Sequence, residues 1–150
     1  MTASAVGVDI IEIERVERAL ERWGERFLGR VYTAVEVAFC RGRVHELAAR
    51  FAAKEAVMKA LGTGARGLAW REIEVLPNRR GKPLVYLYGR AKERAEEIGL
   101  TGLDVSMSHS REYAVTFGVG HSEEPEPQRE RWREKLIAIL RQRGLMVDNG

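Results

Sequence analysis

The sequence predicts an α+β fold in which antiparallel strands pack against helices, with a helical extension at the C-terminus. Two observations lead to this prediction. Helical patterns are interspersed with short strand pairs separated by turn residues, which favours an α+β fold over a doubly wound one. The composition then changes after residue 120. We therefore expect one domain over residues 1–120 and a linker with an amphipathic helix over residues 121–150.

The first part of the chain predicts a strand followed by a three-sided helix. Residues 5–11 are rich in Val and Ile, as is typical of a strand. After this segment, apolar residues recur at the alternating steps of three and four that mark one helix face, namely Ile13, Val16, Leu20, Trp23 and Phe27. Glutamates form a second stripe at helical spacing. Arginines form a third, which contains Arg15, Arg18, Arg22 and Arg26.

The remaining segments predict helices and strand pairs in alternation. The alanine-rich residues 46–61 are typical of a helix, and Gly62-Thr63-Gly64 would end it. Residues 77–83 contain Pro, Asn and Gly, which predict a hairpin turn. The other expected elements are strands at 72–76, 84–88, 103–108 and 113–119 and a helix at 90–98. After a linker at 121–128, an amphipathic helix ending near Gly144 is predicted from Trp132, Leu136, Ile139 and Leu140.

The composition narrows the class of protein. The chain has 150 residues, of which 45% are hydrophobic and 31% charged, and its formal net charge is +3. A net charge this small does not by itself predict nucleic-acid binding. The single cysteine, Cys40, excludes a disulfide within one chain and favours the cytosol. Because signal-peptide and membrane-span patterns are also missing, we expect a cytoplasmic protein that binds neither membranes nor nucleic acid.

Two carboxylates are candidates for chemistry. Asp9 interrupts an apolar strand, where a lone carboxylate is costly unless it is paired or binds a cation. Glu55 lies four residues before Lys59, so the two share one helix face. Each has an ordinary explanation, because Asp9 could cap the next helix and Glu55 could form a surface ion pair. Together the carboxylates would suit Mg²⁺ bound with a phosphate, to which Lys59 would add positive charge.

A histidine among hydroxyl groups and the arginine stripe are further candidates. His109 lies between Ser108 and Ser110 and could contact a phosphate or transfer a proton, or it could be an ordinary turn residue. Arginine and glutamate stripes side by side are typical of a solvated, salt-bridged helix. The arginine stripe also begins six residues after Asp9 and could attract an acidic partner.

Three segments, in this order, resemble the holo-[acyl-carrier-protein] synthases, the small trimeric class of 4′-phosphopantetheinyl transferases. The resemblance covers about residues 5–119. It is carried by Gly7-Val8-Asp9-Ile10 with Arg15, by Arg50-Phe51-Ala52-Ala53-Lys54-Glu55-Ala56 with Lys59, and by Val105-Ser106-Met107-Ser108-His109-Ser110. Gly62-Thr63-Gly64 and Gly81-Lys82-Pro83 also match the family, whereas residues 120–150 have no counterpart that we identify.

The resemblance implies a phosphopantetheinyl transferase fold, a homotrimer with active sites between subunits, and a role in fatty-acid and lipid biosynthesis. It implies that coenzyme A and apo-acyl carrier protein are substrates and that holo-carrier and adenosine 3′,5′-bisphosphate are products. The expected Mg²⁺ ligands are Asp9 and Glu55, and the expected catalytic residues are Glu55, Lys59 and His109. Coenzyme A is expected to bind Lys59, Gly64, Ser108, His109, Ser110 and Arg41. The carrier protein is expected to bind Arg15, Arg18 and Arg22.

Other functions remain open on the residues alone. A binding module could use the arginine helix to hold an acidic protein or nucleic acid, and would need neither Asp9 nor Glu55. Another Mg²⁺-dependent nucleotide enzyme, such as a pyrophosphohydrolase, would generally carry denser carboxylate clusters. The tail is expected to dock on its own trimer through Trp132, Leu136 and Ile139, and contact with the carrier protein or another enzyme is the alternative.

Overall fold

The computed structural model describes residues 4–63, 67–125 and 127–147. Its elements follow the chain in the order β1 (Ser4–Glu12), α1 (Ile13–Trp23), α2 (Glu25–Val31), α3 (Ala34–Cys40), α4 (Val44–Leu61), the 3₁₀ helix η1 (Trp70–Glu72), β2 (Ile73–Pro77), β3 (Pro83–Leu87), α5 (Gly89–Glu97), β4 (Gly102–His109), β5 (Tyr113–His121) and α6 (Arg129–Gln142). The strands form one antiparallel sheet in the order β1-β5-β4-β3-β2. The predicted α+β class is therefore confirmed.

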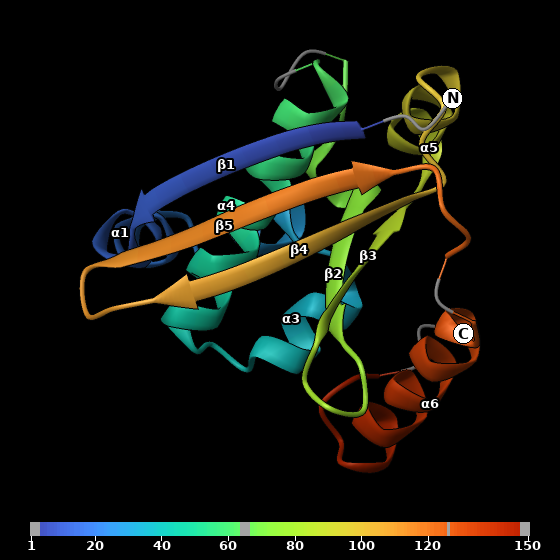
Figure 1. Ribbon diagram of the computed structural model, residues 1–150. Helices are drawn as coiled ribbons and strands as arrows, with labels where there is room; N and C mark the ends of the chain where they lie inside the picture. Colours follow the sequence, from blue (N-terminus) through green and yellow to red (C-terminus); the bar gives the residue numbers. More distant parts are fainter. Residues whose placement is uncertain (1–3, 64–66, 126, 148–150) are drawn as a thin grey trace.

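The helix α4 crosses one face of β1, β5 and β4 and lies at the centre of the core (Figure 1). Small side chains allow this close packing, because Ala52, Ala53 and Ala56 are fully buried. The closest approach is at Gly7, where an added Cβ would lie 2.0 Å from the carbonyl oxygen of Ala56. Glycine is required there because no side chain fits between the two backbones. The centre of β1 is thereby held directly against α4.

The face of β1 and β5 that lies away from α4 in Figure 1 carries apolar side chains that are exposed in the single chain. Because side chains alternate along a strand, these residues point away from α4. They are Val6, Val8 and Ile10 of β1 and Tyr113, Val115 and Phe117 of β5. Val6 and Ile10 are each 62% exposed. A contiguous apolar surface of this kind usually marks an interaction site.

The helices after β1 differ from the prediction. The helix expected to run to Phe27 stops at Trp23, because Gly24 has a φ of 51° and separates α1 from α2. The helix α3 was not predicted, although its N-terminus has a capping box. Glu36 N donates to Thr33 Oγ1 at 3.2 Å, and Thr33 N donates to Glu36 Oε1 at 2.9 Å.

Two of the described carboxylates, Glu36 and Glu74, are fully buried, and each is paired with a basic side chain. Lys54 Nζ donates to Glu36 Oε1 at 2.6 Å, and both side chains have no solvent exposure. Burial lowers the pKa of Lys54, and Glu36 opposes that shift. The second pair joins α6 to β2, because Arg133 Nε donates to the buried Glu74 Oε1 at 2.6 Å. Thr33 Oγ1 also donates to Glu74, at 2.5 Å.

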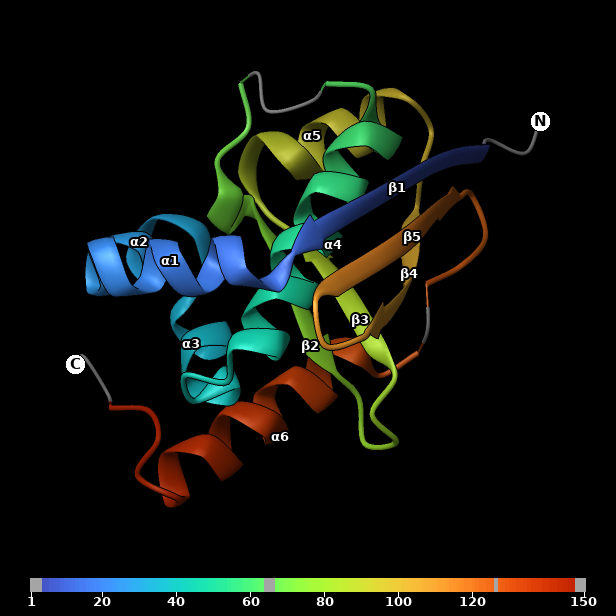
Figure 2. The same cartoon turned by 90° about the vertical axis from the view of Figure 1, so that its left-hand side faces the viewer.

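The helix α6 packs against α3 and the β2–β3 hairpin (Figures 1 and 2). Leu136 and Leu140 are buried there, and Trp132 Nε1 donates to the carbonyl oxygen of Pro77 at 2.7 Å. Docking of the tail on its own trimer through Ile139 stays a prediction, because the single chain leaves this residue 37% exposed. It lies toward solvent because Leu140 occupies the buried side of the helix. Among the described residues, no helix has the length and apolar character that crossing a bilayer requires.

Candidate active site

The structure brings Asp9, Glu55 and Lys59 together where β1 crosses α4. Asp9 follows Gly7 by two residues and therefore lies on the same side of the strand, toward α4. Lys59 Nζ donates to Asp9 Oδ1 at 3.1 Å and to the carbonyl oxygen of Val8 at 3.0 Å. Glu55, one turn earlier on α4, shares a side-chain hydrogen bond with Asp9. The Asp9 side chain is 10% exposed and that of Lys59 55%, so the ammonium group reaches solvent.

The two carboxylates strongly influence each other. Burial raises the pKa of Glu55 to about 7, and the charge of Asp9 and the hydrogen bond with it add to that shift. Lys59 and Arg15 act in the opposite direction. A divalent cation would relieve this repulsion, and carboxylate oxygens are the donors that Mg²⁺ prefers. The pair therefore fits a hard cation.

The protein supplies only part of a coordination shell at this place. Within residues 4–63, 67–125 and 127–147, no group of three or more His, Cys, Asp or Glu side chains is arranged to hold a metal ion. Mg²⁺ keeps several water ligands and is commonly bound through one or two carboxylates together with substrate phosphates. A cation held by Asp9 and Glu55 would take its other ligands from such oxygens.

The arginine stripe lies along the exposed side of α1. Arg15 is close enough to Glu55 to lower the pKa of that carboxyl. Arg18 Nη2 donates to Glu14 Oε1 at 2.7 Å, an exposed pair of the kind that adds little stability. The guanidinium of Arg22 lies 4.9 Å from the centre of the Trp23 ring. These arginines share the exposed surface of α1 with Glu14, Glu17 and Glu21, so both signs of charge lie next to the carboxylate pair.

His109 lies on the α4 face of the sheet but not beside Asp9. It pairs with Ala114 of β5, which pairs with Ile11 of β1, so one strand separates His109 from β1. Ser108 pairs with the exposed Val115 and therefore points to the opposite face of the sheet. Ser108 and His109, which the sequence placed in one candidate segment, therefore lie on opposite faces of the sheet.

The third residue of that segment, Ser110, has a local structural role. Its Oγ accepts a hydrogen bond from Tyr113 N at 3.2 Å, and Ser110 N donates to the carbonyl oxygen of Tyr113 at 2.8 Å. These bonds close the turn between β4 and β5. A role in binding would have to coexist with this turn.

His45 is a residue that no pattern in the sequence singles out. It lies in the first turn of α4, and its ring centre is 4.9 Å from that of His109 with the ring planes tilted by 32°. Its Nε2 lies 3.9 Å from Glu46 Oε1. Only the packing of α4 on the sheet brings the two histidines together, so the sequence carried no signal for this contact.

Two predicted coenzyme residues remain, Arg41 and Gly64. Arg41 ends α3 in a left-handed conformation with a φ of 49°, and its side chain is exposed. Arg43 instead caps that helix, because its Nε and Nη2 donate to the carbonyl oxygens of Cys40 and Phe39 at 2.9 and 2.7 Å. Gly64 lies outside the described residues.

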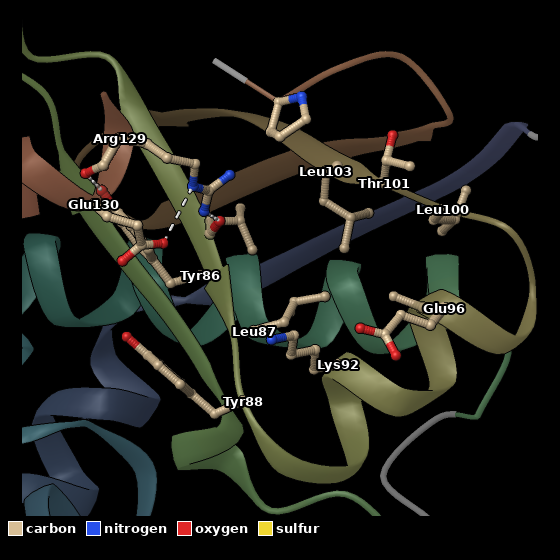
Figure 3. A pocket seen from close by; sticks show the side chains of 14 residues that line it. Tyr86, Leu87, Tyr88, Lys92, Glu96, Leu100, Thr101, Leu103, Arg129 and Glu130 are labelled. Atoms are coloured by element: carbon tan, nitrogen blue, oxygen red, sulfur yellow. Dashed lines mark hydrogen bonds and ion pairs between the residues drawn. The ribbon is translucent and has the colours of Figure 1, made fainter. Parts of the chain in front are cut away.

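A separate cavity of about 480 Å³ lies between β3, α5 and the start of α6 (Figure 3). Apolar side chains such as Leu100 and Leu103 line it, and none of the predicted site residues does. Arg129 lies at its edge, with its guanidinium 4.4 Å from the centre of the Tyr86 ring and its Nε 3.9 Å from Glu130 Oε1. This cavity is thus distinct from the carboxylate site.

Comparisons with known proteins place the chain in a family. The family model described as the 4′-phosphopantetheinyl transferase superfamily matches residues 5–118. A holo-[acyl-carrier-protein] synthase from Herpetosiphon aurantiacus is 50% identical over 121 residues, which cover 76% of this chain and 95% of the relative. The chain belongs to the holo-[acyl-carrier-protein] synthase family. The family predicted from the three sequence segments is therefore confirmed.

Solved synthase structures agree with the observed fold. The Helicobacter pylori synthase in complex with coenzyme A has a TM-score of 0.71 and 30% identity, covering 77% of this chain and 98% of that one. The Chronobacterium ammoniagenes complex with coenzyme A has a TM-score of 0.68 and 34% identity, covering 81% and 99%. The helix α6 lies beyond the residues that the synthase family model matches.

Proposed function

We propose that this chain transfers the 4′-phosphopantetheine group from coenzyme A to a serine of apo-acyl carrier protein in a Mg²⁺-dependent reaction. The observation that carries the proposal is the convergence of Asp9, Glu55 and Lys59 in a member of this family. Solved relatives in complex with coenzyme A support the choice of donor. The synthase names of the relatives support the choice of acceptor.

The reaction forms a phosphoester bond to the carrier serine and breaks the phosphoanhydride bond of coenzyme A. The serine oxygen attacks the phosphorus that bears pantetheine, and the bond from that phosphorus to the bridging oxygen breaks. The products are holo-carrier and adenosine 3′,5′-bisphosphate, which keeps the bridging oxygen. The serine proton passes to a base, for which we propose Glu55, acting directly or through a water molecule. Lys59 stabilises the negative charge that develops on the leaving group, and His109 is proposed to assist it.

Asp9 and Glu55 are the residues that would hold Mg²⁺. When bound, the ion offsets the charge of the pyrophosphate during transfer. Asp9 is fixed for this task by the close packing of β1 on α4 at Gly7. Lys59 contacts Asp9, and its side chain is also exposed to solvent. It is therefore placed to meet an incoming phosphate.

We further propose that the chain forms a homotrimer whose active sites lie between subunits. Support comes from the exposed apolar face of β1 and β5, which a single chain leaves uncovered. Asp9 lies on the edge strand β1, so a neighbouring subunit could approach the site closely. Residues such as Ser108, which points away from Asp9, could then serve the site of another subunit. A cytoplasmic location and a role in lipid biosynthesis belong to the same proposal.

Carrier modification tests the proposed reaction directly. Purified protein, coenzyme A, Mg²⁺ and an apo-carrier are incubated, and the intact mass of the carrier is measured. We expect a gain equal to one phosphopantetheine group. We expect Asp9→Asn and Glu55→Gln to lose most of this transfer and also to lose Mg²⁺ binding in calorimetric titration. Glu93→Gln, which changes an exposed carboxylate on α5, is the matched control.

Each alternative has a separate signature. Full transfer by Glu55→Gln in saturating Mg²⁺ would show that Glu55 is neither the base nor an essential metal ligand. The absence of any mass gain across several carriers would favour a binding module that acts through the arginines of α1. Release of 4′-phosphopantetheine and adenosine 3′,5′-bisphosphate without carrier modification would favour a hydrolase.

A further inference from the structure

The β2–β3 hairpin and the first half of α6 enclose a cleft of about 670 Å³. Its described lining holds no acidic residue, although basic residues line it from both sides. The basic residues are Arg79, Arg80, Lys82, Arg129, Arg131 and Lys135. The cleft therefore combines a segment of the synthase family with the helix that lies beyond the family match at residues 5–118.

Both walls of the cleft are fixed by hydrogen bonds. Asn78 Oδ1 accepts from Arg80 N at 2.9 Å and from Lys82 N at 3.0 Å, which fixes the hairpin turn. On the other side, Trp132 Nε1 donates to the carbonyl oxygen of Pro77 at 2.7 Å and ties α6 to the base of the hairpin. The basic side chains therefore project from a rigid frame, which lowers the cost of ordering a ligand.

Four of the described basic side chains in the cleft have no partner that would neutralise their charge. Arg79, Arg80, Arg131 and Lys135 have no side-chain hydrogen bond or ion pair with any residue that the structure describes. Arg129 differs, because it donates to the carbonyl oxygen of Val85 and contacts Glu130. Like charges gathered in one concave region create a positive potential that an anion would neutralise.

The chemistry of the lining selects the kind of anion. Arginine presents paired N–H groups that match the oxygens of a phosphate, and lysine adds a point charge. Trp132 contributes an aromatic wall among these cations. The volume lies in the range of small-molecule sites, and a concave site of this kind suits a compact ligand better than a flat protein surface.

We propose that this cleft is a second ligand site, which binds a small molecule with at least two phosphate groups. Arg79 and Arg80 hold the phosphates from the hairpin, and Arg131 and Lys135 hold them from α6. The site shares no residue with the carboxylate pair on β1 and α4. It does not depend on the proposed transfer reaction.

The indole N–H of Trp132 gives a local readout of binding. The uniformly ¹⁵N-labelled full chain has three indole signals, from Trp23, Trp70 and Trp132, and the last is assigned with Trp132→Phe. We expect pyrophosphate and adenosine 3′,5′-bisphosphate to shift the Trp132 signal in a saturable way and to leave the other two nearly unchanged. Inorganic phosphate is expected to bind at least tenfold more weakly. The absence of a saturable Trp132 shift with either ligand would overturn the proposal.

Paired substitutions test whether ligand affinity depends on the residues of the cleft or only on the net charge of the protein. Pyrophosphate binding is measured by calorimetric titration for three double variants. Two change the cleft, Arg79→Ala/Arg80→Ala and Arg131→Ala/Lys135→Ala. The third, Arg141→Ala/Arg143→Ala, is the control. Each pair lowers the formal charge by the same two units, from +3 to +1. We expect each cleft pair to weaken binding roughly tenfold and the control pair to change it little.

Three results would contradict the assignment. An equal loss in the control pair would mean that binding follows total charge. An equal effect of sodium chloride at matched ionic strength would mean that the shift is only screening. Displacement of the ligand by duplex DNA with higher affinity than any small phosphate would identify a nucleic-acid surface instead.

Discussion

Replacing Arg133 by Met tests whether α6 is an integral part of the fold. The substitution keeps an unbranched apolar stem but removes the guanidinium that faces Glu74. Glu74 is fully buried, and Arg133 donates to it from Nε at 2.6 Å and from Nη2 at 3.2 Å. Without Arg133, the carboxylate keeps only the neutral donors Thr33 Oγ1 at 2.5 Å and Tyr88 OH at 2.9 Å.

The expected loss follows from the burial of this pair. Removing one partner of a buried ion pair typically costs about 3–5 kcal/mol, because the other charge stays desolvated. We expect a value near the lower end, about 3 kcal/mol. Two hydroxyl donors remain, and the Arg133 side chain is 24% exposed, so water can enter in its place. For a chain of this size the melting temperature would fall by roughly 9 °C.

The free energy of unfolding is measured by urea denaturation at pH 7 and followed by circular dichroism. Arg131→Met is the matched control, since Arg131 is an exposed arginine two positions away on the same helix. We expect it to change stability by no more than about 0.5 kcal/mol. If Arg133→Met cost no more than this control, the Glu74–Arg133 pair would not be what ties α6 to the core.

The pH dependence gives an independent check of the same pair. Burial alone would raise the pKa of Glu74, but hydrogen bonds from Arg133 and Thr33 hold it below its usual value. Its contribution to stability is therefore present above the unfolded pKa of about 4.3 and is lost as the pH falls through the folded pKa. In Arg133→Met, burial should raise the pKa, so protonation stabilises the variant as the pH falls. The stability gap between the two proteins should narrow from pH 7 to pH 4, and a widening gap would refute the assignment.

Two further predictions concern packing. Gly7→Ala should destabilise the protein by about 3 kcal/mol or more, because the new Cβ would lie 2.0 Å from the carbonyl oxygen of Ala56. Its control, Gly29→Ala, meets no atom within 4 Å in α2 and should be neutral or stabilising in the same urea experiment; equal effects would contradict the close packing. Burial raises the pKa of Cys40 to about 12, so a disulfide reagent at pH 8 should label it only after unfolding, and rapid labelling of the native protein would contradict this.

Local sequence patterns were enough to predict most of the strands and the helix of the candidate site. The alanine-rich segment became α4, and Gly7, Asp9 and Glu55 meet where that helix packs on β1. These elements were predictable because the residues that define each strand or helix are close along the chain and follow a regular period. The capping box at Thr33, with Glu36 three residues later, is a sequence signal for the start of α3.

The periodic patterns of the sequence did not predict contacts between segments that are far apart along the chain. The pairing of Glu74 with Arg133 and the contact between the His45 and His109 rings join elements that the fold alone brings together. The amphipathic pattern of the tail predicted a docked helix, but it did not distinguish Leu140, which is buried, from Ile139, which is exposed. Both residues lie near the boundary of the apolar face, where the partner surface decides which of them is covered.

The arrangement of charge in space determines what the basic residues can bind. On α1 the arginines alternate with glutamates, and a pair such as Arg18 with Glu14 already meets at 2.7 Å. At the hairpin and the first turns of α6, cations from two distant segments converge on a cleft whose described lining has no carboxylate. The net charge of +3 sums over the whole chain and therefore does not distinguish these two surfaces. We therefore expect binding of phosphate-rich small molecules to respond to substitutions in the cleft and not to equal changes of charge elsewhere.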